Sequence, residues 1–429
     1  MSINKHFPRL LVISNSCMSN MTSNGRTIKN FLLGWNKEKI AQFFIQNETP
    51  DFTVCKNFFR VTDTQALRAF IYGEKPRECI QLYDDIKKHD SFSTTNKSRR
   101  NSVTMFLREL VWNSNRWRKC GFEKWVEDFS PEVVLLQAGD SPFMFKIALN
   151  VCEKFNIPLI IYNSEVYYYK NYDYFNSKGV FHFFYPLFHA YYKKIFDRTI
   201  NYASKSIYIS EMVQKKYDNS FKLPSETVYT STEVKRMPKK KENPSFVVSY
   251  LGNLGVGRHE SLIVIGDVLQ KISTDYKLDV YGKIPDDTVL KAFASCKGIN
   301  YRGYVSYEQV LNVMQSSDLL VHVENFSEYY KKDLQYAFST KIADSLASGV
   351  GFLLFAPEEM SCSRYLKNNN AAFVISDRSE LFKTLKMLSD NPDDCQKFCE
   401  NALALVEKNH NSSYNTEQFQ RIILNSIND

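Results

Sequence analysis

The sequence predicts two α/β domains, each built around a doubly wound, Rossmann-like sheet with helices on both faces. Three observations predict this fold class. The 429 residues exceed the length at which one hydrophobic core usually divides. Short apolar runs alternate with segments of helical periodicity, as they do in βαβ units. The alternation stops at a basic, proline-containing stretch, residues 233–245, and then starts again.

The first half, residues 1–232, contains continuous apolar runs of the kind that form buried parallel strands. These runs are residues 10–14, 39–45, 131–137, 157–162 and 206–210. Helical periodicity lies between them at residues 27–35, 122–129, 143–155 and 211–217.

The pattern recurs in residues 246–409, after residues 233–245, which we interpret as an exposed linker. Strands are predicted at residues 246–251, 277–281, 299–301, 319–323, 351–355 and 372–375. Helices are predicted at residues 260–272, 307–315, 339–349, 379–389 and 393–408. A last helix, at about 410–429, is expected to return to the first domain. Ligands of such folds bind at the carboxyl ends of the strands, so we expect a central cleft between the domains.

The composition limits the compartments and the kinds of partner that are expected for this protein. Nine cysteines are scattered without a Cys-x-x-Cys pair, which favours a reducing compartment over a disulfide scaffold or a zinc site. No signal-peptide pattern and no apolar run of about 20 residues occurs, so we expect a cytoplasmic protein whose membrane contact is at most peripheral. The net charge of +8 suits phosphate-bearing partners, an anionic membrane or nucleic acid. No RNA-binding or helix-turn-helix pattern emerges, so we predict no nucleic-acid partner.

The most informative segment is the predicted helix start at Ser339, Thr340 and Lys341, with Asp344 one turn further on. The first turn of a helix has unpaired N–H groups and the positive end of the helix dipole, and therefore attracts anions. A basic residue strengthens that preference. The segment indicates a site for a phosphate-bearing ligand with hydroxyls, or else an ordinary capped helix.

Two further turns follow strands in the same half. The first contains Gly252, Asn253 and Arg258, and the second contains Gly282 and Lys283. Glycines allow the backbone to approach a ligand closely, and arginine can hold phosphate oxygens with two parallel hydrogen bonds. Neither turn matches the Rossmann or P-loop spacing, so turns with a purely structural role remain the alternative.

In the first half, acids follow two predicted strands: Asp140 and Glu165. Each could orient an acceptor hydroxyl or act as a base, although acids after strands are also common as caps. Gly25 and Arg26 lie in a loop whose backbone N–H groups could stabilise developing negative charge, or which is an ordinary surface loop.

The order of these motifs resembles that of family-4-like glycosyltransferases of the GT-B fold, of the bacterial surface-polysaccharide type. The resemblance rests on an ordered set of degenerate motifs. They are Gly252-Asn-Leu, Arg258, Tyr281-Gly, Gly303-Tyr-Val-Ser, Ser317-Asp-Leu-Leu-Val, Ser339-Thr-Lys with Asp344, and Ala347-Ser-Gly. The resemblance covers nearly the whole chain and includes the N-terminal strands.

The resemblance implies roles for the candidate residues. Arg258 would contact the donor diphosphate, Ser339, Thr340 and Lys341 would lie near the phosphates or the sugar, and Asp344 would hold the ribose hydroxyls. The chain departs from the family at Tyr336, where a second acid is common, and at Asn253, where an arginine is common. No Asp-x-Asp motif occurs, so we expect no metal and no cofactor besides the nucleotide-sugar.

The resemblance implies a hexosyltransferase that moves a sugar, with retention of configuration, from a nucleotide-diphosphate sugar such as a UDP-sugar. The acceptor would be a saccharide or a lipid-linked acceptor in surface polysaccharide biosynthesis. The alternatives are a GT-B-type nucleotide-sugar epimerase and a non-catalytic protein that binds a nucleotide-sugar or a polyanion.

Two segments mix basic and aromatic residues, residues 97–119 and 167–200. Such a mixture suits the headgroup layer of an anionic membrane, here the inner face of the cell membrane. The alternative is that the aromatic side chains pack into the core of the first domain.

Overall fold

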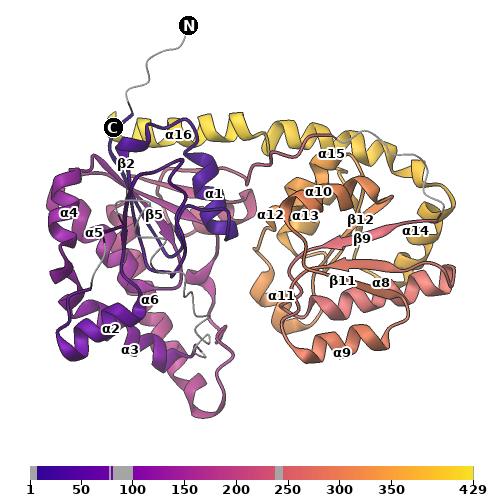
Figure 1. Cartoon of the computed structure of the whole chain (residues 1–429), viewed down its shortest axis with the longest axis horizontal. Helices are drawn as coiled ribbons and strands as arrows, with labels where there is room; N and C mark the ends of the chain where they lie inside the picture. Colours follow the sequence, from indigo (N-terminus) through magenta and orange to yellow (C-terminus); the bar gives the residue numbers. More distant parts are fainter. Residues whose placement is uncertain (1–6, 77–78, 81–99, 237–244, 429) are drawn as a thin grey trace, which may run out of the picture. The chain divides into compact units, whose positions relative to one another are not determined.

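The structure, a computed structural model, describes residues 7–76, 79–80, 100–236 and 245–428. The chain forms two compact units (Figure 1). The first consists of Met1–Tyr229 with Ser413–Asp429, and the second is Thr230–Ser412. Residues 233–236 of the expected linker belong to the second unit, and residues 237–244 lie outside the described residues.

The first unit contains an eight-stranded sheet of order β4-β3-β2-β1-β5-β6-β7-β8. The strands are β1 (Leu10–Ser14), β2 (Ile40–Phe44), β3 (Asn57–Arg60), β4 (Cys79–Ile80), β5 (Val133–Ala138), β6 (Leu159–Asn163), β7 (Lys205–Tyr208) and β8 (Ser225–Thr227). Only β4 runs antiparallel to its neighbour among the strands described here. Leu10 of β1 pairs with Ile40 on one side and Val133 on the other, so the apolar runs form the centre of the sheet. The predicted α/β class is confirmed.

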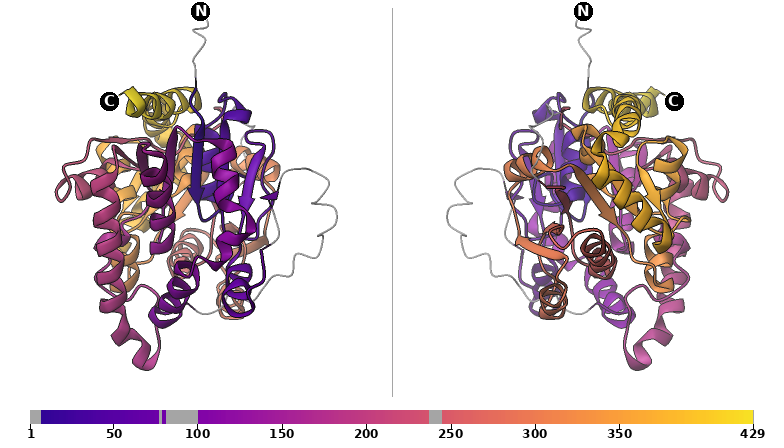
Figure 2. Two further views of the ribbon diagram at one scale, coloured as in Figure 1. Left: turned by 90° about the vertical axis from the view of Figure 1, so that its left-hand side faces the viewer. Right: turned by 90° about the vertical axis from the view of Figure 1, so that its right-hand side faces the viewer.

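Helices cover both faces of this sheet (Figure 2). They are α1 (Ser23–Phe31), α2 (Asp63–Tyr72), α3 (Ser102–Asn113), α4 (Phe122–Phe129), α5 (Pro142–Phe155), α6 (Tyr185–Tyr202), α7 (Glu211–Asp218) and α16 (Ser412–Asn428). Short 3₁₀ turns join them, among them η3 (Arg116–Cys120), η4 (Tyr167–Tyr169) and η5 (Gly179–Phe184). In α16, Phe419 stacks on Phe31 of α1 with ring centroids 4.5 Å apart, which fixes the last helix to this unit.

The high aromatic content fills the core of the first unit. Phe43 contacts Trp112, Trp117 and Phe122, with ring centroids 5.1 to 6.5 Å apart. Aromatic pairs in such tilted and edge-to-face arrangements add stabilisation beyond the area they bury. Many rings of residues 97–119 and 167–200 are therefore core residues, as the alternative interpretation held.

The second unit contains a parallel six-stranded sheet of order β11-β10-β9-β12-β13-β14. The strands are β9 (Val248–Leu251), β10 (Leu278–Tyr281), β11 (Ile299–Gly303), β12 (Leu319–Val323), β13 (Gly351–Phe355) and β14 (Phe373–Ile375). The helices are α8 (Arg258–Ile272), α9 (Asp287–Ser295), α10 (Tyr307–Ser316), α11 (Glu328–Leu334), α12 (Thr340–Ser348), α13 (Ser361–Asn368), α14 (Arg378–Asp390) and α15 (Gln396–Asn409). β9, β12 and β13 form the centre, so the loops that follow them share one edge of the sheet.

Candidate functional site

In the second unit, β12 and α8 bring together an arginine, a glutamate and a histidine. Arg258, the first residue of α8, donates from Nε and Nη2 to the two carboxylate oxygens of Glu324, at 3.0 and 2.7 Å. Glu324 directly follows β12, and its Oε1 also lies 3.2 Å from Nε2 of His322. The side chains are 12%, 5% and 6% exposed for Arg258, Glu324 and His322. A buried ion pair with a histidine beside it therefore lies at the carboxyl end of the sheet.

Electrostatics fix the charge state of this cluster. Burial acts to raise the pKa of Glu324, but attraction to Arg258 and the hydrogen bond with His322 outweigh it, so the pKa lies below its ordinary value. Burial lowers the pKa of His322, and the positive charges of Arg258 and Lys341 lower it further, against the opposing effect of Glu324. We conclude that Arg258 and Glu324 are ionised while His322 is neutral.

The expected contact between Arg258 and the donor diphosphate stays a prediction, and the geometry adds a partner that was not expected. Two of the three guanidinium nitrogens of Arg258, Nε and Nη2, already donate to a carboxylate. The net charge that Arg258 and Glu324 offer to a ligand is therefore close to zero.

The two glycine turns are explained by backbone packing. A side chain at Gly282 would place its Cβ 2.1 Å from the carbonyl oxygen of Gly252, so the turns after β9 and β10 touch each other. Asn253 accepts a hydrogen bond on Oδ1 from Gly255 N at 2.9 Å, which stabilises its own turn. Lys283 is exposed, and its ammonium group has no hydrogen bond or ion pair with the described residues. Gly252, Asn253 and Gly282 thus have structural roles, and the contact of these residues and of Lys283 with a donor stays a prediction.

The start of α12 lacks a side-chain cap. Ser339 occupies the N-cap position in an extended conformation, yet its hydroxyl accepts no hydrogen bond from the first turn. Thr340 and Lys341 are the first two residues of the helix and are half-buried. The ammonium group of Lys341 is close enough to lower the pKa of His322. Lys341 therefore interacts electrostatically with His322 of the Arg258–Glu324–His322 cluster, and the first turn of its helix has N–H groups of the kind that bind anions.

Asp344 lies one turn into α12, but its environment differs from the prediction. It is buried, and its Oδ1 accepts a hydrogen bond of 2.6 Å from the hydroxyl of Thr232. This bond fixes residues 230–232 to α12. If Asp344 holds ribose hydroxyls, its carboxylate must accept hydrogen bonds from them and from Thr232 at the same time.

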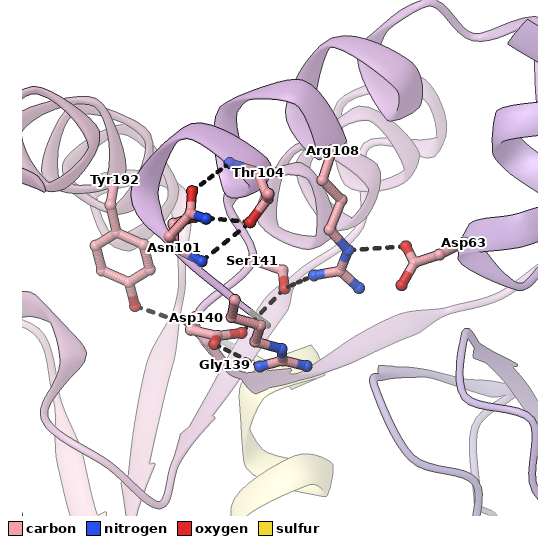
Figure 3. A network of polar contacts seen from close by, with 9 residues as sticks. Asp63, Asn101, Thr104, Arg108, Gly139, Asp140, Ser141 and Tyr192 are labelled. Carbon is pink, nitrogen blue, oxygen red and sulfur yellow. Dashed lines mark hydrogen bonds and ion pairs between the residues drawn. The ribbon is translucent and has the colours of Figure 1, made fainter. Parts of the chain in front are cut away.

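In the first unit, Asp140 belongs to a polar network at the end of β5 (Figure 3). Its Oδ2 lies 2.9 Å from Arg100 Nη1, and its Oδ1 accepts from the Ser141 hydroxyl at 3.1 Å. Arg108 donates to Ser141 Oγ at 2.6 Å and to Asp63 at 2.8 Å. Asp140 is thus a buried, ion-paired carboxylate held in one orientation. Such a group is better suited to orient an acceptor hydroxyl than to accept its proton.

The other three candidates of this unit have different surroundings. Gly25 lies in the first turn of α1, which begins at Ser23 and not at the expected residue 27 because Thr22 caps it by accepting from Gly25 N at 3.2 Å. A Cβ at Gly25 would lie 2.2 Å from the carbonyl oxygen of Cys17, so close packing explains the glycine. Arg26 is half-buried, without an ion pair to any described residue. Glu165 lies 4.0 Å from the ammonium group of Lys170.

Sequence reasoning missed three ionisable groups: Glu324, Arg100 and Glu109. Glu109 of α3 accepts hydrogen bonds from Phe143 N at 3.0 Å and from the Tyr191 hydroxyl at 3.3 Å. Burial raises the pKa of Glu109 to about 7 from an ordinary value near 4.5, against the opposing effects of the Phe143 N–H and of Lys146. An acid inside an otherwise apolar helical stripe is the signal that could have identified it.

We predict that Glu109 makes the first unit less stable as the pH rises. Because its pKa is raised in the folded state, the folded state binds a proton more tightly than the unfolded state between about pH 4.5 and 7. The contribution of Glu109 to the free energy of unfolding is fully present below pH 4.5. It is lost as the pH rises to about 7, and the loss is on the order of 3 kcal/mol. Thermal unfolding should show this fall in the parent and a flatter profile in Glu109→Gln. Parallel profiles for both proteins would contradict the assignment.

No helix among the described residues is long and apolar enough to cross a bilayer. No group of three or more histidines, cysteines or acids in this part of the chain is placed to hold a metal ion. That the protein uses no metal stays a prediction.

Comparisons with known proteins identify the fold. Residues 265–421, little more than a third of the chain, match a family model described as glycosyl transferase-like. No curated protein sequence matches the chain. A structure of S. aureus TarM with fondaparinux, alpha-GlcNAc-glycerol and UDP is similar at 15% identity and a TM-score of 0.53, over 71% of this chain and 58% of that one.

Two other structures match almost end to end. Anabaena HepE in complex with UDP has a TM-score of 0.61 at 10% identity, over 97% of this chain and 100% of that one. The lipopolysaccharide outer core galactosyltransferase WaaB has a TM-score of 0.57 at 12% identity, over 96% and 98%. The chain spans just under three fifths of TarM but nearly all of HepE and WaaB. The chain therefore has the two-domain GT-B fold, and its residues 265–421 match the glycosyl transferase-like family.

Proposed function

We propose that this protein is a glycosyltransferase that moves a hexose from a UDP-sugar to a hydroxyl of a saccharide or lipid-linked acceptor, with retention of configuration. One observation carries the proposal. Lys341, in the first turn of a helix whose start has no side-chain cap, interacts electrostatically with His322 of the buried cluster, and both residues lie within the region that matches the glycosyl transferase-like family. The UDP bound to HepE and to TarM supports the choice of nucleotide.

The diphosphate would be held by Lys341, by the N–H groups of Thr340 and Lys341, and by the exposed Lys283. Arg258 would act indirectly, because its charge is balanced by Glu324. As bonds to the leaving group break, negative charge develops on the diphosphate, and fixed N–H dipoles with a lysine stabilise that charge. In the first unit, Asp140 would orient the acceptor hydroxyl, with Glu165 and Arg26 as further acceptor contacts.

The experiment is a panel of UDP-sugars incubated with the full chain, with release of UDP measured in the presence and absence of saccharide acceptors. Turnover of at least one UDP-hexose is the expected result. Tight UDP binding without turnover would favour the non-catalytic alternative, and interconversion of the sugar without release of UDP would favour the epimerase. Absence of both binding and turnover would contradict the proposal.

We also propose that the protein works in surface polysaccharide biosynthesis, at the cytoplasmic face of an anionic membrane. The support is a set of exposed apolar side chains on neighbouring elements of the first unit, α2, α3, η5 and the start of α6. Its largest exposed members are Tyr72, Leu107, Leu110, Val180, Phe183 and Leu187, each 56–72% exposed. Figures 1 and 2 show α3 beside η5 at one end of this unit. Exposed apolar patches of this kind mark interaction sites, and the exposed Lys75 and Lys178 suit anionic headgroups.

Replacing Phe183 and Leu187 by glutamine should reduce flotation of the protein with phosphatidylglycerol-containing vesicles at least severalfold, because two of the most exposed apolar side chains are lost. Leu290→Gln is the matched control, since Leu290 is 45% exposed on α9 of the other unit. Failure of the parent to float, or equal flotation of all three proteins, would contradict the membrane proposal.

A further inference from the structure

The first unit contains a pocket of about 320 Å³ in its helical layer, formed by α3, η3, α5 and α6. None of its lining residues belongs to the donor or acceptor candidates. One wall is a stripe of α5 that contains Phe143, Lys146, Ile147 and Asn150. The volume is at the lower end of the range for small-molecule sites, about 300–1,000 Å³, so a ligand of about one sugar ring fits.

The polar part of the lining contains positive and amide groups and no carboxylate. The lining cations are Arg118, Lys146 and Arg198, and the lining amides are Asn113, Asn115 and Asn150. Two carboxylates pair with the arginines, Glu123 with Arg118 at 2.9 Å and Glu153 with Arg198 at 2.7 Å, but neither lines the pocket. These pairs balance the charges of Arg118 and Arg198, so Lys146 is the lining cation without an ion pair to any described residue.

Several of these groups have unused hydrogen-bonding capacity. Nε of Arg118 is buried and has no hydrogen-bond partner. The Lys146 ammonium donates to Asn113 Oδ1 at 3.1 Å and to the Tyr191 hydroxyl at 2.7 Å, which leaves one of its three donors. Asn115 and Asn150 are exposed, and no described residue bonds to their amides. A buried donor without a partner calls for a ligand or a water at that place.

The apolar part of the lining is rigid. Trp112 and Phe143 stack with ring centroids 4.4 Å apart and an interplanar angle of 6°, and both are buried. Ile147 and Leu149 continue this surface. A fixed apolar wall with several polar groups around it suits a sugar ring, which has apolar C–H faces and a rim of hydroxyls.

We propose that this pocket binds a single saccharide unit that carries an anionic group, a phosphate or a carboxylate. The amides bind the hydroxyls, and Lys146 binds the anion. The site is separate from the donor site, so it adds a second saccharide contact to the protein whether or not the proposed transfer reaction is correct.

The test is calorimetric titration of the full chain with glucose 6-phosphate, glucuronate, glucose and inorganic phosphate. Glucose 6-phosphate or glucuronate should bind at least tenfold more tightly than glucose and inorganic phosphate. Equal affinity for glucose would overturn the anionic assignment, tighter binding of inorganic phosphate would overturn the saccharide assignment, and absence of binding would overturn the site.

Asn150→Asp places a negative charge in the pocket at an exposed position without a change of side-chain size, and should weaken binding of the anionic sugar about tenfold. Asn219→Asp is the matched control, because Asn219 is exposed on the same unit outside the lining. Equal affinity in the two variants would overturn the location. UDP affinity should be the same in both variants and the parent, which separates this site from the proposed donor site.

Discussion

Arg258→Ala should lower the free energy of unfolding of the second unit by about 3–5 kcal/mol, because it leaves the Glu324 carboxylate buried without its cation. In the parent, the lowered pKa of Glu324 means that this group stabilises the fold above its unfolded pKa and loses that effect as the pH falls. In the variant, the missing cation raises the pKa, so acidification from neutral pH should recover part of the lost stability. Chemical denaturation at several pH values measures both effects.

Arg302→Ala provides the matched control. Arg302 pairs with Asp279 at 3.1 Å in the same unit, but its side chain is 50% exposed. Exposed ion pairs are worth about 0–1 kcal/mol, so this variant should unfold close to the parent. The double variant Arg258→Met/Glu324→Leu should regain most of the stability, since it removes the buried charge altogether. Equal losses for Arg258→Ala and Arg302→Ala would show that the buried pair does not have the proposed role.

Lys341→Ala should weaken UDP binding about 10- to 100-fold. Hydrogen bonds to a charged group contribute about 1.5–3 kcal/mol, and each 1.4 kcal/mol is a factor of ten in affinity. The reason is positional: Lys341 is the second residue of a helix whose start has no side-chain cap, and the charge of Arg258 is balanced by Glu324. Calorimetric titration with UDP measures the change.

Lys291→Ala is the control for this second prediction, since Lys291 is an exposed lysine on α9 of the same unit. Its UDP affinity should equal that of the parent, as should the melting temperatures of both lysine variants. An unchanged dissociation constant for Lys341→Ala would show that the diphosphate does not bind at the start of α12.

The central strands could be predicted from the sequence because a buried parallel strand is a continuous apolar run. β1, β5, β12 and β13 are such runs, and each is buried along its whole length. β8 could not be predicted in this way: Ser225–Thr227 is a half-buried edge strand of polar residues. α6 was not predicted either, although its buried side chains, among them Tyr185, Phe188, Tyr192 and Phe196, recur at helical spacing.

The sequence indicated where the candidate site residues lie relative to the strands and helices, but not which residues they contact. Arg258 was expected in the turn before a helix at residue 260 and is the first residue of that helix, but its partner Glu324 lies 66 residues further along the chain. The same holds for Asp344 and Thr232, which are 112 residues apart, and for Asp140 and Arg100, which are 40 apart. A local pattern shows which groups follow a strand and contains no information on which distant charge the fold brings to them.

Hydrogen exchange of the full chain with and without UDP tests the central claim most directly, because it locates the nucleotide on the backbone. The proposal predicts slower exchange at the first turn of α12, in peptides that contain Thr340 and Lys341, and in the turn after β10, which contains Lys283. Slower exchange confined to the first unit, or no change at α12 at UDP concentrations that saturate binding, would contradict it.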